Sequence, residues 1–280
     1  MAGLQVRCLQ VEPGDPERVL AEVERASPGD LVVLPELWPA GYFAFDRYRA
    51  VATPLDGPLL GEDGELSRLA GRLGITLHAG SVVEAGADGV LHNTSAVFGP
   101  DGRRLAVYRK VHVFGYRSRE QDLVTGGTKV ATYPLAVPGS AAGAAPFRAG
   151  MATCYDLRFP ELFRAMADEV ACYVVPAAWP AARTGHWSAL LAARAIEDQA
   201  FVVGCNAAGT DHGVALAGRS AVVDPWGAVV AEAGEGPQGL VVSIELEAAG
   251  AARAEFPALA DRRWPAGRGE DAPAPGSPRV

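Results

Sequence analysis

The sequence predicts an α/β fold with mixed sheets, and three observations support this prediction. Short apolar runs rich in β-branched residues alternate with amphipathic helical patterns along most of the chain. The apolar runs are nearly continuous, which is typical of strands covered on both faces by other layers. Several runs are joined by short turns, such as GPDG at 99–102, which indicate hairpins and therefore antiparallel neighbours within the sheets.

A strand, a helix and a second strand open the chain. Asp15 precedes the helix and can cap its N-terminus, and Pro16 suits the first helical turn. Val19, Leu20 and Val23 recur at helical spacing. The predicted unit runs over 4–11, 15–26 and 30–36.

The same alternation continues through most of the remaining chain. Further helices are predicted near 63–74, at 160–168 and at 186–200. Further strands are predicted within 75–85, 91–113, 150–156, 171–179 and 201–209, with a hairpin at 218–234. A loop rich in Gly and Ala interrupts the pattern at 138–146.

The absence of a linker favours one domain, because length and composition alone permit one domain or two. A chain of 280 residues can form one large core or two domains, and 49% hydrophobic with 21% charged residues is typical of globular proteins. No linker-like composition break lies within 1–260. We expect one domain over 1–265, followed by a poorly ordered tail at 266–280 that is rich in Pro, Gly and Ala.

The charge pattern and the first residues narrow the classes of partner. The formal net charge is -8, and no basic run carries interleaved aromatics, so nucleic acid is not an expected partner. The stretch 1–15 lacks the basic and apolar segments of a secretory signal, and no window approaches 18 uninterrupted apolar residues. We expect a cytoplasmic protein with no membrane contact.

Four cysteines are widely separated along the chain. They form no Cys-x-x-Cys pair and have no histidine at zinc-ligand spacing, so we expect no metal site. In a reducing compartment each would be a free thiol, and the ordinary interpretation of a free cysteine is a small buried hydrophobe. The cysteines are Cys8, Cys154, Cys172 and Cys205.

Three polar residues lie at the ends of apolar, strand-like runs. They are Glu36 in LVVLPELW, Lys110 in AVYRKVHVF and Cys154 in AGMATCYD. Because strand ends are where α/β folds gather side chains at a ligand crevice, we expect these residues to share one site.

The three side chains have complementary chemistry. A thiol attacks as the thiolate and has an ordinary pKa of about 8.5, so a carboxylate such as Glu36 can act as the base that removes its proton. A carbonyl attacked by sulfur develops negative charge on its oxygen, which the ammonium of Lys110 can stabilise.

In this order and spacing, the three segments resemble the Glu-Lys-Cys triad of the nitrilase superfamily of carbon–nitrogen hydrolases. The resemblance extends over roughly 4–264 and includes CYDLRFPELFR, LLAARAIEDQAFVVGCNAAG and SAVVDPWG. The segment VVPAAWPAARTGHW resembles the Nit-type, omega-amidase-like branch. At Asp198 the relatives usually carry an amide.

The resemblance implies a fold and an assembly. We expect a four-layer α-β-β-α sandwich that needs no cofactor and forms a homodimer or a higher homo-oligomer through its helices. Arg158 and Glu161 would form a pair at a helix end, contribute to that interface or contact the substrate, and His186 and Trp187 would pack against the core.

The resemblance also implies roles for the site residues. Cys154 would attack the substrate carbonyl, and Glu36 would accept the thiol proton and later activate water. Lys110 and the backbone N–H of Tyr155 would hold the oxyanion, and Glu120 would position the substrate and Lys110. Tyr42, Phe114 and Trp179 would either line the pocket as an apolar wall or serve as ordinary core residues.

The predicted activity is hydrolysis of a small amide, the omega-amide of a dicarboxylic or keto acid, through a cysteine thioester with release of ammonia. The triad serves equally for an N-carbamoyl amino acid or a nitrile, and the carbamoyl substrate is the closer rival. A protein from another class, a non-catalytic thiol sensor, would need a lost triad member, and Glu36, Lys110 and Cys154 are all present.

Overall fold

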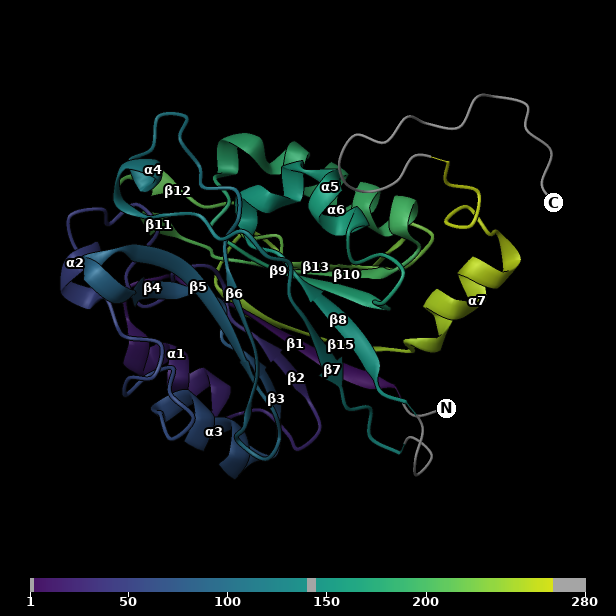
Figure 1. Cartoon of the computed structure of the whole chain (residues 1–280), viewed down its shortest axis with the longest axis horizontal. Helices are drawn as coiled ribbons and strands as arrows, with labels where there is room; N and C mark the ends of the chain where they lie inside the picture. Colours follow the sequence, from purple (N-terminus) through teal and green to yellow (C-terminus); the bar gives the residue numbers. More distant parts are fainter. Residues whose placement is uncertain (1–2, 140–144, 264–280) are drawn as a thin grey trace.

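Two sheets stack face to face, and helices cover the outer side of each (Figure 1). This computed structural model describes residues 3–139 and 145–263. Helices α1 and α3 lie on the outer side of one sheet, and α5 and α6 lie on the outer side of the other. The arrangement is therefore the expected four-layer α-β-β-α sandwich. The predicted tail at 266–280 lies outside the described residues.

The first sheet contains both the first and the last strand along the described chain. Its strands run in the order β15-β1-β2-β3-β5-β4, with β6 paired to β5. Strands β1, β2 and β3 are parallel, whereas β15 joins β1 in antiparallel register. The strands are β1 (Leu4–Gln10), β2 (Leu31–Val33), β3 (Thr76–His78), β4 (Val82–Ala85), β5 (Leu91–Phe98), β6 (Arg104–Arg109) and β15 (Gln238–Ile244).

The second sheet is mixed as well. Its order is β14-β13-β10-β9-β8-β7, with β8, β9 and β10 parallel and the outer pairs antiparallel. The strands are β7 (Thr132–Leu135), β8 (Phe147–Met151), β9 (Cys172–Ala177), β10 (Phe201–Asn206), β13 (Ala221–Val223) and β14 (Val229–Glu232). A small separate hairpin comprises β11 (Thr210–Asp211) and β12 (Val214–Ala215).

The helices are short except for α6. The Asp15 side chain accepts a hydrogen bond from the N–H of Arg18 at 3.1 Å, so the predicted cap of α1 is confirmed. The helices are α1 (Pro16–Val23), α2 (Tyr48–Val51), α3 (Glu65–Leu73), α4 (Glu120–Leu123), α5 (Pro160–Arg164), α6 (Thr184–Asp198) and α7 (Glu247–Glu255), with 3₁₀ turns η1 (Ala87–Gly89), η2 (Cys154–Arg158) and η3 (Ala181–Arg183).

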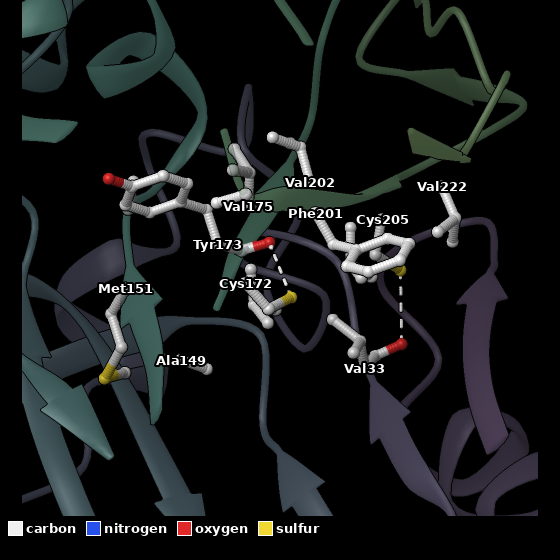
Figure 2. Packing of buried hydrophobic residues seen from close by; sticks show 14 of the residues in the cluster. Val33, Ala149, Met151, Cys172, Tyr173, Val175, Phe201, Val202, Cys205 and Val222 are labelled. Atoms are coloured by element: carbon white, nitrogen blue, oxygen red, sulfur yellow. Dashed lines mark hydrogen bonds between the residues drawn. The ribbon is translucent and has the colours of Figure 1, made fainter. Parts of the chain in front are cut away.

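The main core lies between the two sheets, where buried side chains from both meet (Figure 2). The Cys205 thiol of β10 donates a hydrogen bond to the carbonyl of Val33 on β2 at 3.1 Å, which ties the two sheets together. Cys172 on β9 is equally buried. Together with Cys8 these residues are free, fully buried thiols, which confirms the prediction of small buried hydrophobes.

Several boundaries differ from the sequence prediction. The second predicted strand spans only β2, because Pro35 cannot donate to a strand ladder and the chain turns after it. The predicted strand at 150–156 ends at Met151, and a 3₁₀ turn begins at Cys154. The predicted helix at 160–168 ends at Arg164.

Strand β15 and helix α7 were not predicted. Their sequences, QGLVVSI and EAAGAARAE, are half-exposed or rich in alanine and show weak periodicity. Tertiary contacts hold α7 in place: the Arg253 side chain donates to the backbone carbonyls of Gln199, Val170 and Asp198. Helix α7 therefore depends on contacts with residues that lie far away in the sequence.

Within 3–139 and 145–263, no helix is long and apolar enough to cross a membrane. The same described residues contain no group of three or more His, Cys, Asp or Glu side chains that could hold a metal ion.

Candidate active site

Glu36 lies just beyond the end of β2, where the two sheets approach each other. Its backbone N–H donates to the carbonyl of Ala177 at the end of β9, and its carboxylate accepts from the N–H of Ala178 at 3.1 Å. The other carboxylate oxygen accepts hydrogen bonds from Lys110 Nζ at 2.7 Å and from Asn93 Nδ2 at 2.9 Å. The carboxylate is fully buried, with donors on both oxygens.

Lys110 follows β6 and joins two carboxylates. Its ammonium lies 2.7 Å from Glu36 and 3.0 Å from both carboxylate oxygens of Glu120, and it is only 1% exposed. The Tyr42 ring lies beneath it at 5.3 Å. Because a buried charge is costly without partners, these contacts fix Lys110 in one position.

Glu120 opens the short helix α4 and is fully buried. Besides Lys110, it accepts hydrogen bonds from the Tyr42 hydroxyl at 3.0 Å and from the N–H of Phe114 at 2.8 Å. The residue predicted from a short match therefore lies beside Glu36 and Lys110. Its carboxylate also fixes two of the predicted pocket residues, Tyr42 and Phe114.

Cys154 occupies a strained turn between β8 and α5. Its φ of 47° lies in the left-handed region, which non-glycine residues seldom adopt. The turn is held by a capping box in which Thr153 and Asp156 exchange hydrogen bonds. The thiol lines the same cavity as Ala178, whose N–H binds Glu36, and the charges of Glu36 and Lys110 both act on the pKa of the thiol, so the three predicted residues share one site.

Asp156 fastens this turn to the segment that carries Lys110. One carboxylate oxygen accepts from the Tyr108 hydroxyl at 2.7 Å and from the N–H of Thr153 at 2.9 Å. The other accepts from the backbone N–H of His112 at 2.9 Å and lies 2.8 Å from its Nδ1. One buried carboxylate therefore holds both the Cys154 turn and the segment around Lys110.

The electrostatics keep the thiol protonated in the absence of substrate. Burial raises the pKa of Cys154, the negative charge of Glu36 raises it further, and Lys110 only partly offsets both. Burial also raises the pKa of Glu36, opposed mainly by Lys110. Burial alone would lower the pKa of Lys110, but Glu120 and Glu36 together hold it well above its usual range. Cys154 therefore needs a base to become a thiolate.

A cavity of about 30 Å³ lies over the thiol. All four predicted pocket residues, Tyr42, Phe114, Tyr155 and Trp179, line it. The sequence left open whether the aromatic residues line the pocket or fill the core, and the structure places them at the cavity wall. Their contact with substrate stays a prediction.

Two arginines also line this cavity: Arg158, for which substrate contact is one of the predicted alternatives, and Arg183, which was not predicted. Arg158 lies over the Trp179 ring at 4.7 Å, and Arg183 lies over the Phe114 ring at 5.6 Å. Burial lowers the pKa of Arg158, and the neighbouring positive charge of Arg183 lowers it further. Among the described residues, neither has a carboxylate partner.

Near the pocket, one alternative for Arg158 and the packing prediction for His186 are wrong, and the interface and substrate-contact alternatives for Arg158 stay predictions. Arg158 does not pair with Glu161 within the described chain; its side chain lies 3.2 Å from His186 Nδ1. His186 is exposed and does not pack in the core. Trp187 does pack there: it is fully buried and donates to the carbonyl of Arg219 at 2.8 Å.

Two buried asparagines also belong to this site, and the sequence did not predict them. Asn93 donates to both Glu36 and Glu120, and Asn206 accepts from the N–H of Trp179 at 2.7 Å. Each occurs within a buried strand, and an amide in an otherwise buried strand is the signal that could have marked them.

Comparisons of this chain with a family model, with known sequences and with solved structures agree with one another. The family model described as carbon–nitrogen hydrolase matches residues 6–254. The 2-oxoglutaramate amidase of Paenarthrobacter nicotinovorans is 38% identical over 250 residues, covering 88% of this chain and 82% of that protein. The 2-oxoglutaramate amidase of Bacillus subtilis is 33% identical, covering 92% and 97%. The crystal structure of Nit3 from Saccharomyces cerevisiae, a member of branch 10 of the nitrilase superfamily, superposes with a TM-score of 0.81 at 29% identity, covering 94% and 97%.

Proposed function

The chain belongs to the carbon–nitrogen hydrolase family, and on that premise we propose that it hydrolyses the omega-amide of a short dicarboxylic or keto acid to the free acid and ammonia. The amidase names of its relatives support the amide as the scissile group. The proposal further assigns the chemistry to Glu36, Lys110 and Cys154, with Glu120 as a fourth member.

The first step is acylation. Cys154 Sγ attacks the amide carbonyl carbon while Glu36 accepts the thiol proton. Glu36 then delivers that proton to the amide nitrogen, the C–N bond breaks, and ammonia leaves a thioester on Cys154. The negative charge of Glu36 raises the pKa of the Cys154 thiol, and this electrostatic proximity of the two groups supports the route.

Positive charge stabilises the oxyanion formed in this step. Lys110 supplies a fixed ammonium, and the backbone N–H of Tyr155, directly after the nucleophile, supplies a second donor. One preorganised donor of this kind contributes about 10²–10³ in rate. The contacts to Glu120 support this assignment, since they hold Lys110 in place before substrate arrives.

The second step is deacylation. Glu36 removes a proton from water, the hydroxide attacks the thioester carbonyl, and the C–S bond breaks with return of the proton to the sulfur. The acid leaves and the neutral thiol is restored. No cofactor takes part in either step.

The observation that carries the substrate assignment is the arginine pair. Arg158 and Arg183 line the cavity over Cys154 without a carboxylate partner in the described chain. Guanidinium groups bind carboxylates through paired hydrogen bonds, and a substrate carboxylate would relieve the repulsion between the two cations. This favours an amide with an acidic far end over a neutral amide or a simple nitrile.

An N-carbamoyl amino acid also carries a carboxylate, so the test must separate it from an omega-amide. Ammonia release is measured with 2-oxoglutaramate, a neutral amide of similar length, an N-carbamoyl amino acid and the corresponding nitrile. The proposal predicts the highest kcat/KM for the acidic amide and no turnover by Cys154→Ala. A higher kcat/KM for the carbamoyl compound or the neutral amide would reject the substrate assignment. The homodimer and the cytoplasmic location expected from the sequence stay predictions.

A further inference from the structure

Asn93 is a buried amide placed between two carboxylates. It lies on β5 and is only 2% exposed. Its Nδ2 lies 2.9 Å from Oε1 of Glu36 and 2.9 Å from Oε1 of Glu120. One amino group therefore donates to both acids of the site.

Chemistry fixes which way this amide faces. Both neighbouring atoms are carboxylate oxygens, which accept hydrogen bonds when ionised, so the amino side must point at them. The opposite orientation would set the carbonyl oxygen of Asn93 against two acceptors. The geometry therefore has Asn93 donating to one acceptor oxygen of each acid.

The backbone of Asn93 serves the same site. Its carbonyl accepts a hydrogen bond from the N–H of Lys110 at 2.9 Å. The ammonium of Lys110 binds the same two carboxylate oxygens as the Asn93 amide. Asn93 is therefore joined to Glu36, Lys110 and Glu120 at once, without contacting the Cys154 thiol.

We propose that Asn93 is a positioning residue that keeps Glu36 ionised and oriented toward the Cys154 thiol by donating its amide hydrogens to Glu36 and Glu120. The inference rests on the proposed function, because it assigns Glu36 the role of base. It adds a residue that acts on the reaction only through the carboxylates.

The role has a defined pH signature. The titratable groups facing Glu36 are Lys110 beyond β6, Glu120 of α4, Cys154 of η2 and the phenols of Tyr42 and Tyr48. A hydrogen bond donated to a carboxylate favours its charged form, so removing the Asn93 amide raises the pKa of Glu36. The acidic limb of any process that needs ionised Glu36 should move to higher pH, by about one to two pH units.

Alkylation of Cys154 by iodoacetamide provides a readout that needs no amide substrate. The second-order rate is measured from pH 5 to pH 9 in the wild type, Glu36→Gln, Asn93→Ala and Asn93→Ser, with thermal unfolding recorded for each. Thr94→Val is the matched control, because Thr94 lies on the same strand and donates to another buried carboxylate, Glu84, at 2.6 Å. The Thr94 variant loses an equivalent bond outside the site.

We expect the acidic limb to disappear in Glu36→Gln, to move upward in Asn93→Ala and to stay in place in Thr94→Val. Asn93→Ser replaces Asn93→Ala if the alanine variant does not fold. A wild-type midpoint in the folded Asn93 variants, an equal shift in Thr94→Val, or failure of both Asn93 variants to fold would overturn the inference. An unchanged limb in Glu36→Gln would instead reject Glu36 as the base, and with it the proposed mechanism.

Discussion

Lys110 Nζ lies 2.7 Å from Oε1 of Glu36, and both groups are excluded from solvent. The strand ends of one sheet supply both residues, whereas the Cys154 turn follows a strand of the other sheet. The sandwich therefore brings the proposed base and the proposed nucleophile to one site between its two sheets.

Replacing the base should separate folding from chemistry. Glu36→Gln keeps the shape of the side chain but cannot accept the thiol proton, so acylation should fall by about 10²–10⁴. Thermal unfolding should still show a cooperative transition. Stopped-flow measurement of acyl-enzyme formation tests this, and near-normal acylation would remove Glu36 from the role of base.

Removing the ammonium should expose the cost of two buried acids. In Lys110→Met the carboxylates of Glu36 and Glu120 lose their shared cation, and breaking a buried ion pair costs about 3–5 kcal/mol. Burial then raises the pKa of Glu36 without opposition from Lys110, so the folded state binds more protons than the unfolded chain. The deficit in the free energy of unfolding should shrink as pH falls.

Urea unfolding of Lys110→Met and wild type from pH 5 to pH 8 measures this deficit. Lys129→Met, an exposed lysine replaced in the same way, is the control and should change little. A deficit that is the same at every pH would argue against ionised carboxylates facing Lys110.

The arginine pair should control substrate choice. Arg158→Ala and Arg183→Ala should each lower kcat/KM for the acidic omega-amide by about 10- to 100-fold, because each removes hydrogen bonds to a charged group. Turnover of a neutral amide should change much less. Arg72→Ala is a matched control, since Arg72 pairs with Glu24 on the outer surface. Equal losses for acidic and neutral amides would remove the pair from carboxylate binding.

Asp198 should make stability depend on pH. Burial raises its pKa to about 6, although Arg164 and Tyr173 oppose the change. Because the folded pKa exceeds that of the unfolded chain, the carboxyl group stabilises the fold at low pH, and this contribution is lost as pH rises through about 6. Asp198→Asn removes the titration.

The free energy of unfolding of Asp198→Asn, relative to wild type, should accordingly rise by about 1–3 kcal/mol between pH 4 and pH 7. Chemical unfolding at both pH values measures the difference. A constant difference across this range would show that Asp198 does not titrate there.

The sequence predicted the fold well where periodicity and turn residues agree with the tertiary structure. The cap at Asp15, the alternating strands and the buried thiols are examples. Helix α7 was not predicted because its alanine-rich sequence shows little hydrophobic periodicity. Its position depends on Arg253, which donates to backbone carbonyls far away in the sequence. Local patterns carry no information about such a partner.

The site residues also divide into those that local sequence patterns predict and those that they do not. Glu36, Lys110 and Cys154 stand out in the sequence as polar residues at strand ends, and the structure gathers them at one site. Asn93 lies in mid-strand, and its importance depends on which carboxylates the opposite segments supply. The proximity of Arg158 and Arg183 likewise arises only when η2 and η3 meet at the cavity.

Mass spectrometry of the enzyme during turnover of an acidic omega-amide tests the central claim most directly. We predict an acyl adduct on Cys154 that forms with release of one ammonia per subunit, decays on hydrolysis and is absent from Cys154→Ala. Cys172→Ala, which alters a buried thiol outside the site, should retain the adduct. Turnover by Cys154→Ala, or an adduct on any other residue, would contradict the account.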